Sequence, residues 1–249
     1  MNFSSASPDE FSLVDGSVHV WSADLNRSTA EVDEMYEWLS PDEQERSHRF
    51  ISKSLTDSYV VSHAILREIL GRYLNQDPAS LVFEKTPHGK PYLNGQNLTF
   101  NMTHTQGVAL YAIALQPVGI DIECLSRAVE VEEIAKRFFT PSEYQLLLML
   151  PVEQRQQAFY RCWTRKEAFI KAMGEGLTYG LDKFEVDFMK DQNCLISIEN
   201  STAKAKEWDL MALNYSAEHT AALALKGAIK NLSAWGWSRA PASKFEQSS

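Results

Sequence analysis

The sequence contains little cysteine, no long apolar run and no recognisable targeting segment. Cys124, Cys162 and Cys194 are odd in number and far apart, so they have no metal-ligand spacing and indicate a reducing compartment. No stretch approaches the length of a membrane-spanning helix. Residues 1–15 lack the basic segment and apolar run of a signal peptide. We therefore expect a cytoplasmic protein that does not associate with membranes.

Positive charge is also scarce, because 24 Lys and Arg against 33 Asp and Glu give a net charge of −9. Nucleic-acid binding is therefore not expected as the main function, since such surfaces are basic. A local basic pocket for a phosphorylated small molecule stays compatible with this total: Arg161, Arg165, Lys166 and Lys171 cluster in one short segment. The length of 249 residues allows one large domain or two of ordinary size.

The most informative part of the chain is residues 118–177. In residues 118–123 apolar and acidic residues alternate, which predicts a strand with one buried face. Asp121 and Glu123 leave the same face of that strand, and two adjacent carboxylates repel each other unless a cation or a proton lies between them. A hard divalent cation with oxygen ligands, Mg²⁺ above all, fits this pair. A solvated strand edge is the alternative that the pair alone leaves open.

A helix predicted over residues 153–173 carries a second group of charged residues. Phe159 and Trp163 are its apolar anchors, and Glu167 and Lys171 are four apart and share a face. Gly174 ends the helix. Taken alone, such a pair is ordinary solvated helix surface. Its position about forty residues after the strand with two carboxylates is more specific.

Two stretches of the chain resemble each other at an offset of one hundred residues. Residues 18–25 match residues 118–125 in apolar pattern. Ser40-Pro41-Asp42-Glu43 and Thr140-Pro141-Ser142-Glu143 are both capping boxes with proline at the first helical position. A second helix follows each box, at residues 56–74 and 153–173, and strand-like runs follow each helix. Chance similarity of two caps is the alternative to a duplication.

The repeat predicts an α+β fold built by tandem duplication of one α+β half. We expect an N-terminal lead-in over residues 1–17, a first half over 18–116 and a second half over 117–226. Residues 227–249 form a C-terminal tail for which the sequence suggests no role. Within the first half, Lys90 follows a glycine in a turn, and His104 lies at the end of a strand. Alone, these would be a solvated loop charge and a structural histidine.

Residues 119–123, residues 135–139 and the run Trp163-x-x-Lys166-Glu167-Ala168-x-x-Lys171 resemble the signature of the 4′-phosphopantetheinyl transferases. The resemblance is to the longer Sfp type and covers roughly residues 18–226. It implies a monomeric pseudo-dimer with one active site in the cleft between its halves. It also implies a holo-[acyl-carrier-protein] synthase activity. In that reaction, the 4′-phosphopantetheine of coenzyme A passes to a serine of an apo acyl or peptidyl carrier protein, with Mg²⁺ bound and adenosine 3′,5′-bisphosphate released.

The resemblance further implies residue roles. The residues expected to hold Mg²⁺ are Asp121, Glu123 and Glu167. The expected catalytic residues are Lys166 and Lys171, which stabilise the transferring phosphate, and Glu167, which acts directly or through a metal-bound water as the base for the incoming serine. The residues expected to bind coenzyme A are Lys90, Thr103, His104, Arg46 and Arg49, with His104 at the 3′-phosphate.

The chain departs from many relatives at Ser58, where they carry a basic residue; Lys53 or His63 could replace that charge. Two other classes of function remain to be distinguished. One is a carrier-protein binder without catalysis, which a missing carboxylate would have favoured. The other is a Mg²⁺-dependent enzyme acting on another phosphoanhydride, such as a nucleotide. The carrier itself, from fatty-acid, polyketide or nonribosomal peptide biosynthesis, is not distinguished by these residues.

Overall fold

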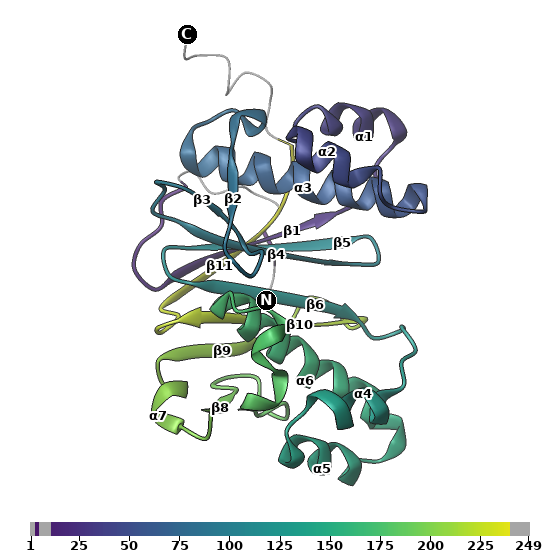
Figure 1. The fold of residues 1–249 in the computed structure, drawn as a ribbon, viewed down its shortest axis with the longest axis vertical. Helices are drawn as coiled ribbons and strands as arrows, with labels where there is room; N and C mark the ends of the chain where they lie inside the picture. Colours follow the sequence, from purple (N-terminus) through teal and green to yellow (C-terminus); the bar gives the residue numbers. More distant parts are fainter. Residues whose placement is uncertain (1–2, 5–10, 240–249) are drawn as a thin grey trace.

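The computed structural model describes residues 3–4 and 11–239, and its centre consists of two β-sheets (Figure 1). The first sheet has the strand order β11-β1-β5-β4, from β11 (Asn231–Gly236), β1 (Ser17–Asp24), β5 (Val108–Ala114) and β4 (Thr99–Thr105). The second has the order β6-β10-β9, from β6 (Val118–Cys124), β10 (His219–Lys226) and β9 (Trp208–Leu213). Neighbouring strands are antiparallel except for β1 and β11, which run parallel.

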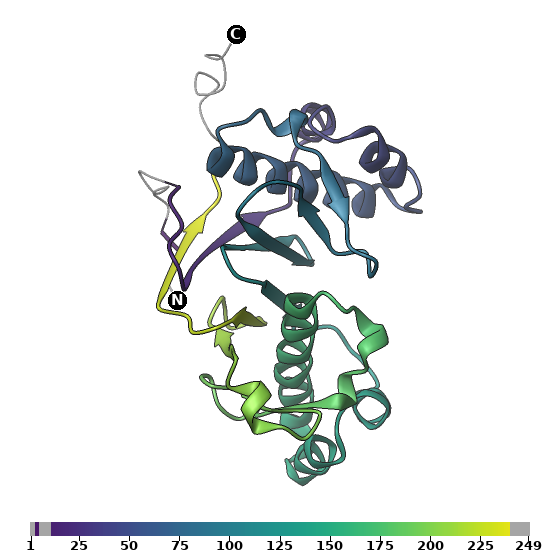
Figure 2. The same ribbon diagram turned by 60° about the vertical axis from the view of Figure 1, so that its left-hand side comes forward.

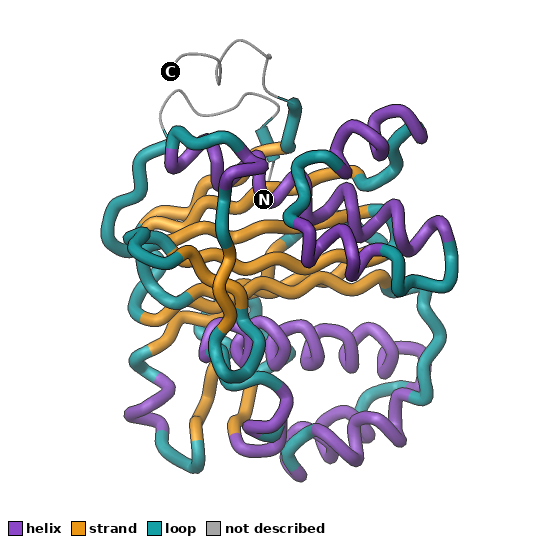
Figure 3. Tube along the Cα trace, turned by 45° about the horizontal axis from the view of Figure 1, so that its top comes forward, coloured by secondary structure: helices purple, strands orange, loops and turns teal. Residues whose placement is uncertain are grey.

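Helices cover the outer face of each sheet, so the strands lie between two helical layers (Figure 3). The first sheet carries α1 (Thr29–Tyr36), α2 (Pro41–Ser47) and α3 (Lys53–Leu74). The second carries α4 (Val131–Phe138), α5 (Pro141–Met149) and α6 (Val152–Met173). The smaller elements are η1 (Pro78–Ser80), the hairpin β2 (Phe83–Lys85) and β3 (Pro91–Leu93), η2 (Leu177–Tyr179), η3 (Leu181–Lys183), the pair β7 (Phe184–Val186) and β8 (Leu195–Ile198), and α7 (Thr202–Ala205).

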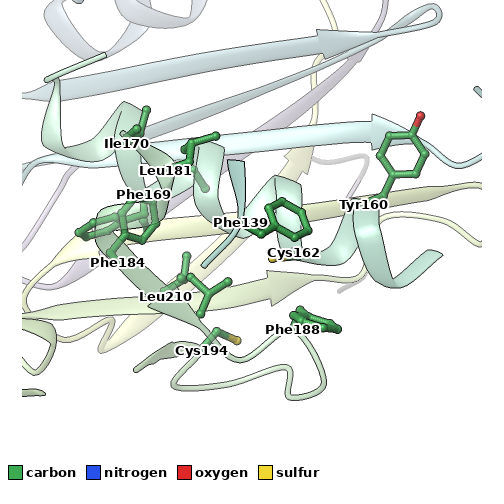
Figure 4. Close-up of a cluster of buried hydrophobic side chains, with 14 of the residues drawn as sticks. Phe139, Tyr160, Cys162, Phe169, Ile170, Leu181, Phe184, Phe188, Cys194 and Leu210 are labelled. Atoms are coloured by element: carbon green, nitrogen blue, oxygen red, sulfur yellow. The ribbon is translucent and has the colours of Figure 1, made fainter. Parts of the chain in front are cut away.

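Strand alternation divides the buried residues among three apolar clusters. In β1, Trp21 and Ala23 belong to the cluster under α3, whereas Val18 and Val20 belong to a cluster shared with Ile120 and the rest of the second sheet. A third cluster surrounds α6 (Figure 4). The shared cluster lies between the two sheets and joins the two halves through a continuous apolar layer.

The tandem α+β duplication is confirmed by this arrangement. The capping boxes at Ser40 and Thr140 are both formed, and proline occupies the first turn of both α2 and α5. The helix that follows each box, α3 or α6, has 22 residues and packs on the sheet of its own half. The exact limits predicted for the two halves remain a prediction.

Part of the predicted C-terminal tail is a strand of the first sheet. Strand β11 pairs in parallel with β1, and Figure 2 shows the two strands side by side. The ring centroids of Trp235 and Trp21 lie 5.2 Å apart. The final segment, residues 240–249, lies outside the described residues, as do residues 1–2 and 5–10 of the expected lead-in.

The helices of residues 11–239 include none with the length and apolar character that a membrane crossing requires. Cys124, Cys162 and Cys194 are free thiols and are buried.

Candidate active site

A cavity of about 1150 Å³ is lined by residues of both halves. The first half contributes side chains from α2, α3 and β4, and the second half contributes side chains from β6 and α6. The charged and polar lining residues of the cavity include Arg46, Tyr59, His63, Asn101, Thr103, His104, Asp121, Glu123, Glu167 and Lys171. Trp163 adds an apolar wall. The volume is at the upper end of that of small-molecule sites, which suits a large, charged ligand.

Gly119 allows β6 to approach α6 closely enough to build this cavity. A Cβ at residue 119 would lie 2.1 Å from the carbonyl oxygen of Ala168 and 2.4 Å from the backbone nitrogen of Ala172. Any side chain there would therefore push the helix away from the strand. Asp121 and Glu123 follow on the same face of β6, which brings them to the α6 face that carries Glu167 and Lys171.

Asp121 is a buried acidic group of the cavity with two side-chain partners. The Nζ of Lys171 lies 2.6 Å from its Oδ1, and Thr103 donates its hydroxyl to the same oxygen at 3.1 Å. Oδ2 is buried and has no hydrogen-bond partner among the described residues. Burial raises the pKa of Asp121, although the charge of Lys171 opposes that rise. An oxygen with free lone pairs in such a position fits a cation ligand.

The pKa values of the other two carboxylates, Glu123 and Glu167, are also raised. Burial, together with the charges of Asp121 and Glu123, raises the pKa of Glu167 to about 7, against the opposing effect of Lys171. Burial and Asp121 also raise the pKa of Glu123. Within the described part of the chain, no three acidic, histidine or cysteine side chains converge into a compact metal cluster. The donor set nevertheless fits Mg²⁺, since mutual repulsion among hard oxygen ligands is what a divalent cation relieves.

The structure places Lys166 outside the cavity, away from the catalytic position expected of it. Its side chain is fully buried in the core of the second half, where Nζ donates to the carbonyls of Leu181 and Phe184 at 2.8 Å each. The same Nζ lies 2.7 Å from Oε2 of Glu143 and 4.6 Å from the ring centroid of Phe184. With these partners around the ammonium group, Lys166 is a structural residue outside the cavity.

Lys90 reaches across from the first half to the second. Its Nζ donates to the carbonyls of Val118, Lys171 and Ala172 at 3.1, 2.6 and 3.1 Å. Burial lowers the pKa of Lys90 to about 8. These bonds join the start of β6 to the carboxyl end of α6, so in this structure Lys90 is a clamp between the halves and its ammonium group points to carbonyls.

The remaining residues expected to bind coenzyme A divide into two groups. Thr103, His104 and Arg46 line the cavity, and Thr103 also orients Asp121. Burial and the nearby Lys171 lower the pKa of His104. Arg49 is not among the lining residues: it is exposed and pairs with Glu45 at 2.6 Å. The expectation that Arg49 binds the coenzyme is therefore not supported by its position.

Neither substitute for the missing basic residue at Ser58 supplies a charge to the cavity. Lys53 is exposed and pairs with Asp57 at 2.7 Å. His63 does line the cavity, but burial lowers its pKa to about 4, so it is neutral at pH 7. Its ring stacks on Tyr59 with centroids 3.9 Å apart, and Ser58 itself borders a smaller cavity beside His104.

Sequence reasoning missed several lining residues, of which Tyr59 and Asn101 matter most. The ring of Tyr59 lies beneath the guanidinium of Arg46, 5.9 Å from its centroid. Asn101 accepts a hydrogen bond from the backbone nitrogen of Ile120 at 2.8 Å and so ties β4 to β6. No local motif marks Tyr59. Asn101 could have been suspected because it begins the run Asn101-Met102-Thr103-His104, which carries two of the residues expected to bind coenzyme A.

The pseudo-dimeric α+β fold, with an acidic cavity between its halves, defines a phosphopantetheinyl-transferase class of protein. Residues 117–224 match the 4′-phosphopantetheinyl transferase superfamily, and residues 23–115 match the N-terminal region of 4′-phosphopantetheinyl transferase. The chain belongs to the 4′-phosphopantetheinyl transferase family, in its Sfp type, and is a transferase enzyme.

Individual relatives agree with this assignment. The chain is 35% identical over 225 residues to the 4′-phosphopantetheinyl transferase HetI of Nostoc sp. strain PCC 7120, covering 88% of this chain and 92% of the relative. It is 31% identical over 175 residues to 4′-phosphopantetheinyl transferase Sfp of Bacillus subtilis strain 168, covering 70% and 77%. It is also 29% identical over 217 residues, covering 76% and 70%, to the human L-aminoadipate-semialdehyde dehydrogenase-phosphopantetheinyl transferase.

Proposed function

We propose that the chain transfers the 4′-phosphopantetheine group of coenzyme A to a serine hydroxyl of an apo acyl or peptidyl carrier protein, in a Mg²⁺-dependent reaction that releases adenosine 3′,5′-bisphosphate. The observation that carries this proposal is that Asp121, Glu123, Glu167 and Lys171 of the second half share one cavity with Arg46 and His104 of the first. A pyrophosphate ester that spans both halves matches this distribution of charge.

Asp121, Glu123 and Glu167 would hold the Mg²⁺ ion. When bound, Mg²⁺ would neutralise charge on the pyrophosphate of coenzyme A. The free Oδ2 of Asp121 and the raised pKa values of all three carboxylates support this ligand set.

Lys171 and Glu167 are the side chains placed to act on the reacting groups. Lys171 neutralises Asp121 in the structure and would turn part of that charge toward the transferring phosphate when coenzyme A is bound. Glu167, which lines the same cavity as Lys171, would accept the proton of the attacking serine. Thr103 would keep Asp121 oriented throughout.

The first half would bind the nucleotide end of coenzyme A. Arg46 and His104 offer the nitrogen donors there, and His104 would contact the 3′-phosphate. Because one chain supplies both walls of the cavity, we propose that a monomer is the active unit. We likewise propose a cytoplasmic location, where coenzyme A and carrier proteins would be accessible, and leave the carrier's pathway to the test below.

The test is an intact-mass measurement on a panel of apo carrier proteins from fatty-acid, polyketide and peptide synthesis. With coenzyme A and Mg²⁺, at least one carrier should gain a phosphopantetheine mass on its serine, and a carrier with that serine changed to alanine should not. EDTA or Asp121→Asn should prevent the gain. A carrier that forms a complex without a mass gain would indicate a binding protein, and hydrolysis of ATP without any carrier would indicate a nucleotide enzyme.

A further inference from the structure

A second cavity, of about 450 Å³, lies on the other side of α6 from the proposed active site. Gln157, Arg161 and Arg165 contribute to its lining and are four residues apart, so they share one face of the helix. Trp163 and Glu167 lie two positions beyond Arg161 and Arg165, about 200° around the helix axis. The remaining lining residues are Leu125, Asp191, residues 212–217 and residues 219–221.

Two buried nitrogen atoms at this cavity have no partner. Arg165 is fully buried: its Nη1 donates to the carbonyl of Arg161 at 2.8 Å and its Nη2 to that of Lys190 at 2.6 Å, but Nε has no acceptor among the described residues. His219 shares a hydrogen bond between Nδ1 and the hydroxyl of Ser216 at 2.8 Å, and its buried Nε2 is likewise unmatched in the described chain. Leaving such groups unsatisfied is costly, so a ligand or water is expected there.

The charges around these atoms leave a positive excess. Arg161 and Arg165 both approach Asp191, at 2.8 and 3.5 Å. Asp191 is the acidic residue among those that line the cavity, and 61% of its side chain is exposed. Burial lowers the pKa of His219, so the ring is neutral at pH 7. The two guanidinium groups therefore face one carboxylate, and guanidinium forks match carboxylate and phosphate oxygens in geometry.

We propose that this cavity binds a small molecule through a phosphate or carboxylate group, at a site separate from the coenzyme site. The oxyanion accepts hydrogen bonds from Arg161, from the Nε–H of Arg165 and from Nε2–H of His219. This assignment uses the His219 tautomer in which Ser216 donates to Nδ1. The ligand displaces the carboxylate of Asp191 from the two guanidinium groups, because that carboxylate already lies mostly in solvent. The transfer reaction uses none of these residues.

The test observes Arg165 directly, by nuclear magnetic resonance of arginine Nε–H groups in the full chain. The signal of Arg165 is assigned by its loss in Arg165→Lys. Inorganic phosphate and sodium acetate are titrated separately, with sodium chloride to control for ionic strength. A saturable shift of the Arg165 Nε–H signal with either anion supports the proposal, and the more effective anion identifies the group that the site takes.

Two charge-removing variants decide whether the contact is direct. Arg161→Gln should weaken the anion's binding about ten- to a hundredfold, because a charged hydrogen bond is lost. Lys190→Gln removes the same charge from a neighbour whose ammonium contacts Asp187 at 3.0 Å, so the dissociation constant should stay unchanged. The proposal is overturned if neither anion gives a saturable shift, if chloride gives the same shift, or if Arg161→Gln binds as tightly as the wild type. The first of these results would assign the unmatched nitrogens to ordered water.

Discussion

Arg67 and Lys166 occupy the same position in the two halves. Each lies fourteen residues after the first residue of its 22-residue helix, α3 or α6. Arg67 Nε lies 2.7 Å from Glu43, and Lys166 Nζ lies 2.7 Å from Glu143. Both glutamates are the third residue of their short helix and close its capping box, so each half ties its short helix to its long helix in the same way.

The next positions show why the carboxylate proposed to act on the α6 side of the cavity has no counterpart there from the first half. Glu68 and Arg72 follow Arg67 as Glu167 and Lys171 follow Lys166. In the first half, Glu68 and Arg72 are buried and paired at 2.6 Å, and Trp237 donates its indole N–H to Glu68. Trp237 therefore contacts the Glu68–Arg72 pair in the first half, whereas the equivalent residues of the second half, Glu167 and Lys171, line the acidic cavity.

The first prediction separates structure from catalysis at Lys166. Lys166→Met should destabilise the protein by about 3–5 kcal/mol, because it leaves Glu143 buried without its partner. The rate of transfer per folded molecule should not change. Urea unfolding and assays at a temperature where the variant is folded check both points.

A second substitution serves as the control for Lys166. Adding Glu143→Gln to Lys166→Met should recover part of the lost stability, since the unpaired charge is gone. Lys171→Met should instead abolish transfer per folded molecule, and it should also cost stability because it leaves the buried Asp121 without its ion-pair partner. A stable but inactive Lys166→Met variant would restore the catalytic role that the sequence motif suggests.

The second prediction concerns the clamp made by Lys90. Lys90→Met should lower the free energy of unfolding by roughly 1–3 kcal/mol, because three carbonyls lose their hydrogen-bond donor. Its preference for coenzyme A over the 3′-dephospho form should persist. If the preference disappears while the melting temperature is unchanged, Lys90 is a phosphate ligand instead of a clamp.

The third prediction is a pH dependence of the metal-free protein. The pKa of Glu167 is raised from 4.5 to about 7, so the folded state binds this proton more tightly than the unfolded state does. The contribution of Glu167 to the free energy of unfolding is therefore fully present below pH 4.5. It is lost as the pH rises to about 7, and the loss is roughly 2–3 kcal/mol.

Glu167→Gln tests that assignment. In EDTA, this variant should be more stable than the wild type at pH 8 and should lose less stability between pH 5 and pH 8. Guanidinium unfolding at the two pH values gives the comparison. Identical pH profiles for the two proteins would show that Glu167 is solvated and that folding does not raise its pKa.

The fourth prediction concerns the C-terminal strand. Trp235 packs on Trp21 and on His19, with ring centroids 5.2 and 4.9 Å away. Trp235→Ala should cost about 2–3 kcal/mol, less than a fully buried tryptophan because its ring is only partly covered. Activity per folded molecule should be kept. Wild-type melting behaviour in this variant would mean that β11 contributes nothing to the first half.

Local sequence patterns were sufficient to predict the repeat and the acidic face of the strand. They did not predict contacts between side chains that lie far apart in the chain. The capping boxes at Ser40 and Thr140 depend on residues three apart, so sequence alone was sufficient for them. Helical periodicity also held a signal that was overlooked: Lys166 lies about 100° around the axis from Glu167, off the face shared by Glu167 and Lys171. The motif was interpreted as a unit, and its core lysine was therefore assigned to the site.

Non-local pairing accounts for the other differences between the expectations and the structure. Strand β11 joins a partner more than two hundred residues earlier in the chain, and nothing in residues 231–236 specifies that partner. Arg49 and Lys90 were assigned from short motifs, yet their neighbours in space are Glu45 for Arg49 and distant carbonyls for Lys90. Composition cannot reveal which cation reaches a cavity.

The most direct test of a single site built by both halves is the kinetics of His104→Ala with coenzyme A and with 3′-dephospho-coenzyme A. His104 lies in the half without the metal carboxylates, so its loss should raise the KM for coenzyme A more than it lowers kcat. The increase should be about ten- to a hundredfold, the value of a hydrogen bond to a charged phosphate. Discrimination against the dephospho form should fall by a similar factor. If His104→Ala keeps the full wild-type preference for the 3′-phosphate, the coenzyme does not extend to His104 and the account of a shared site is wrong.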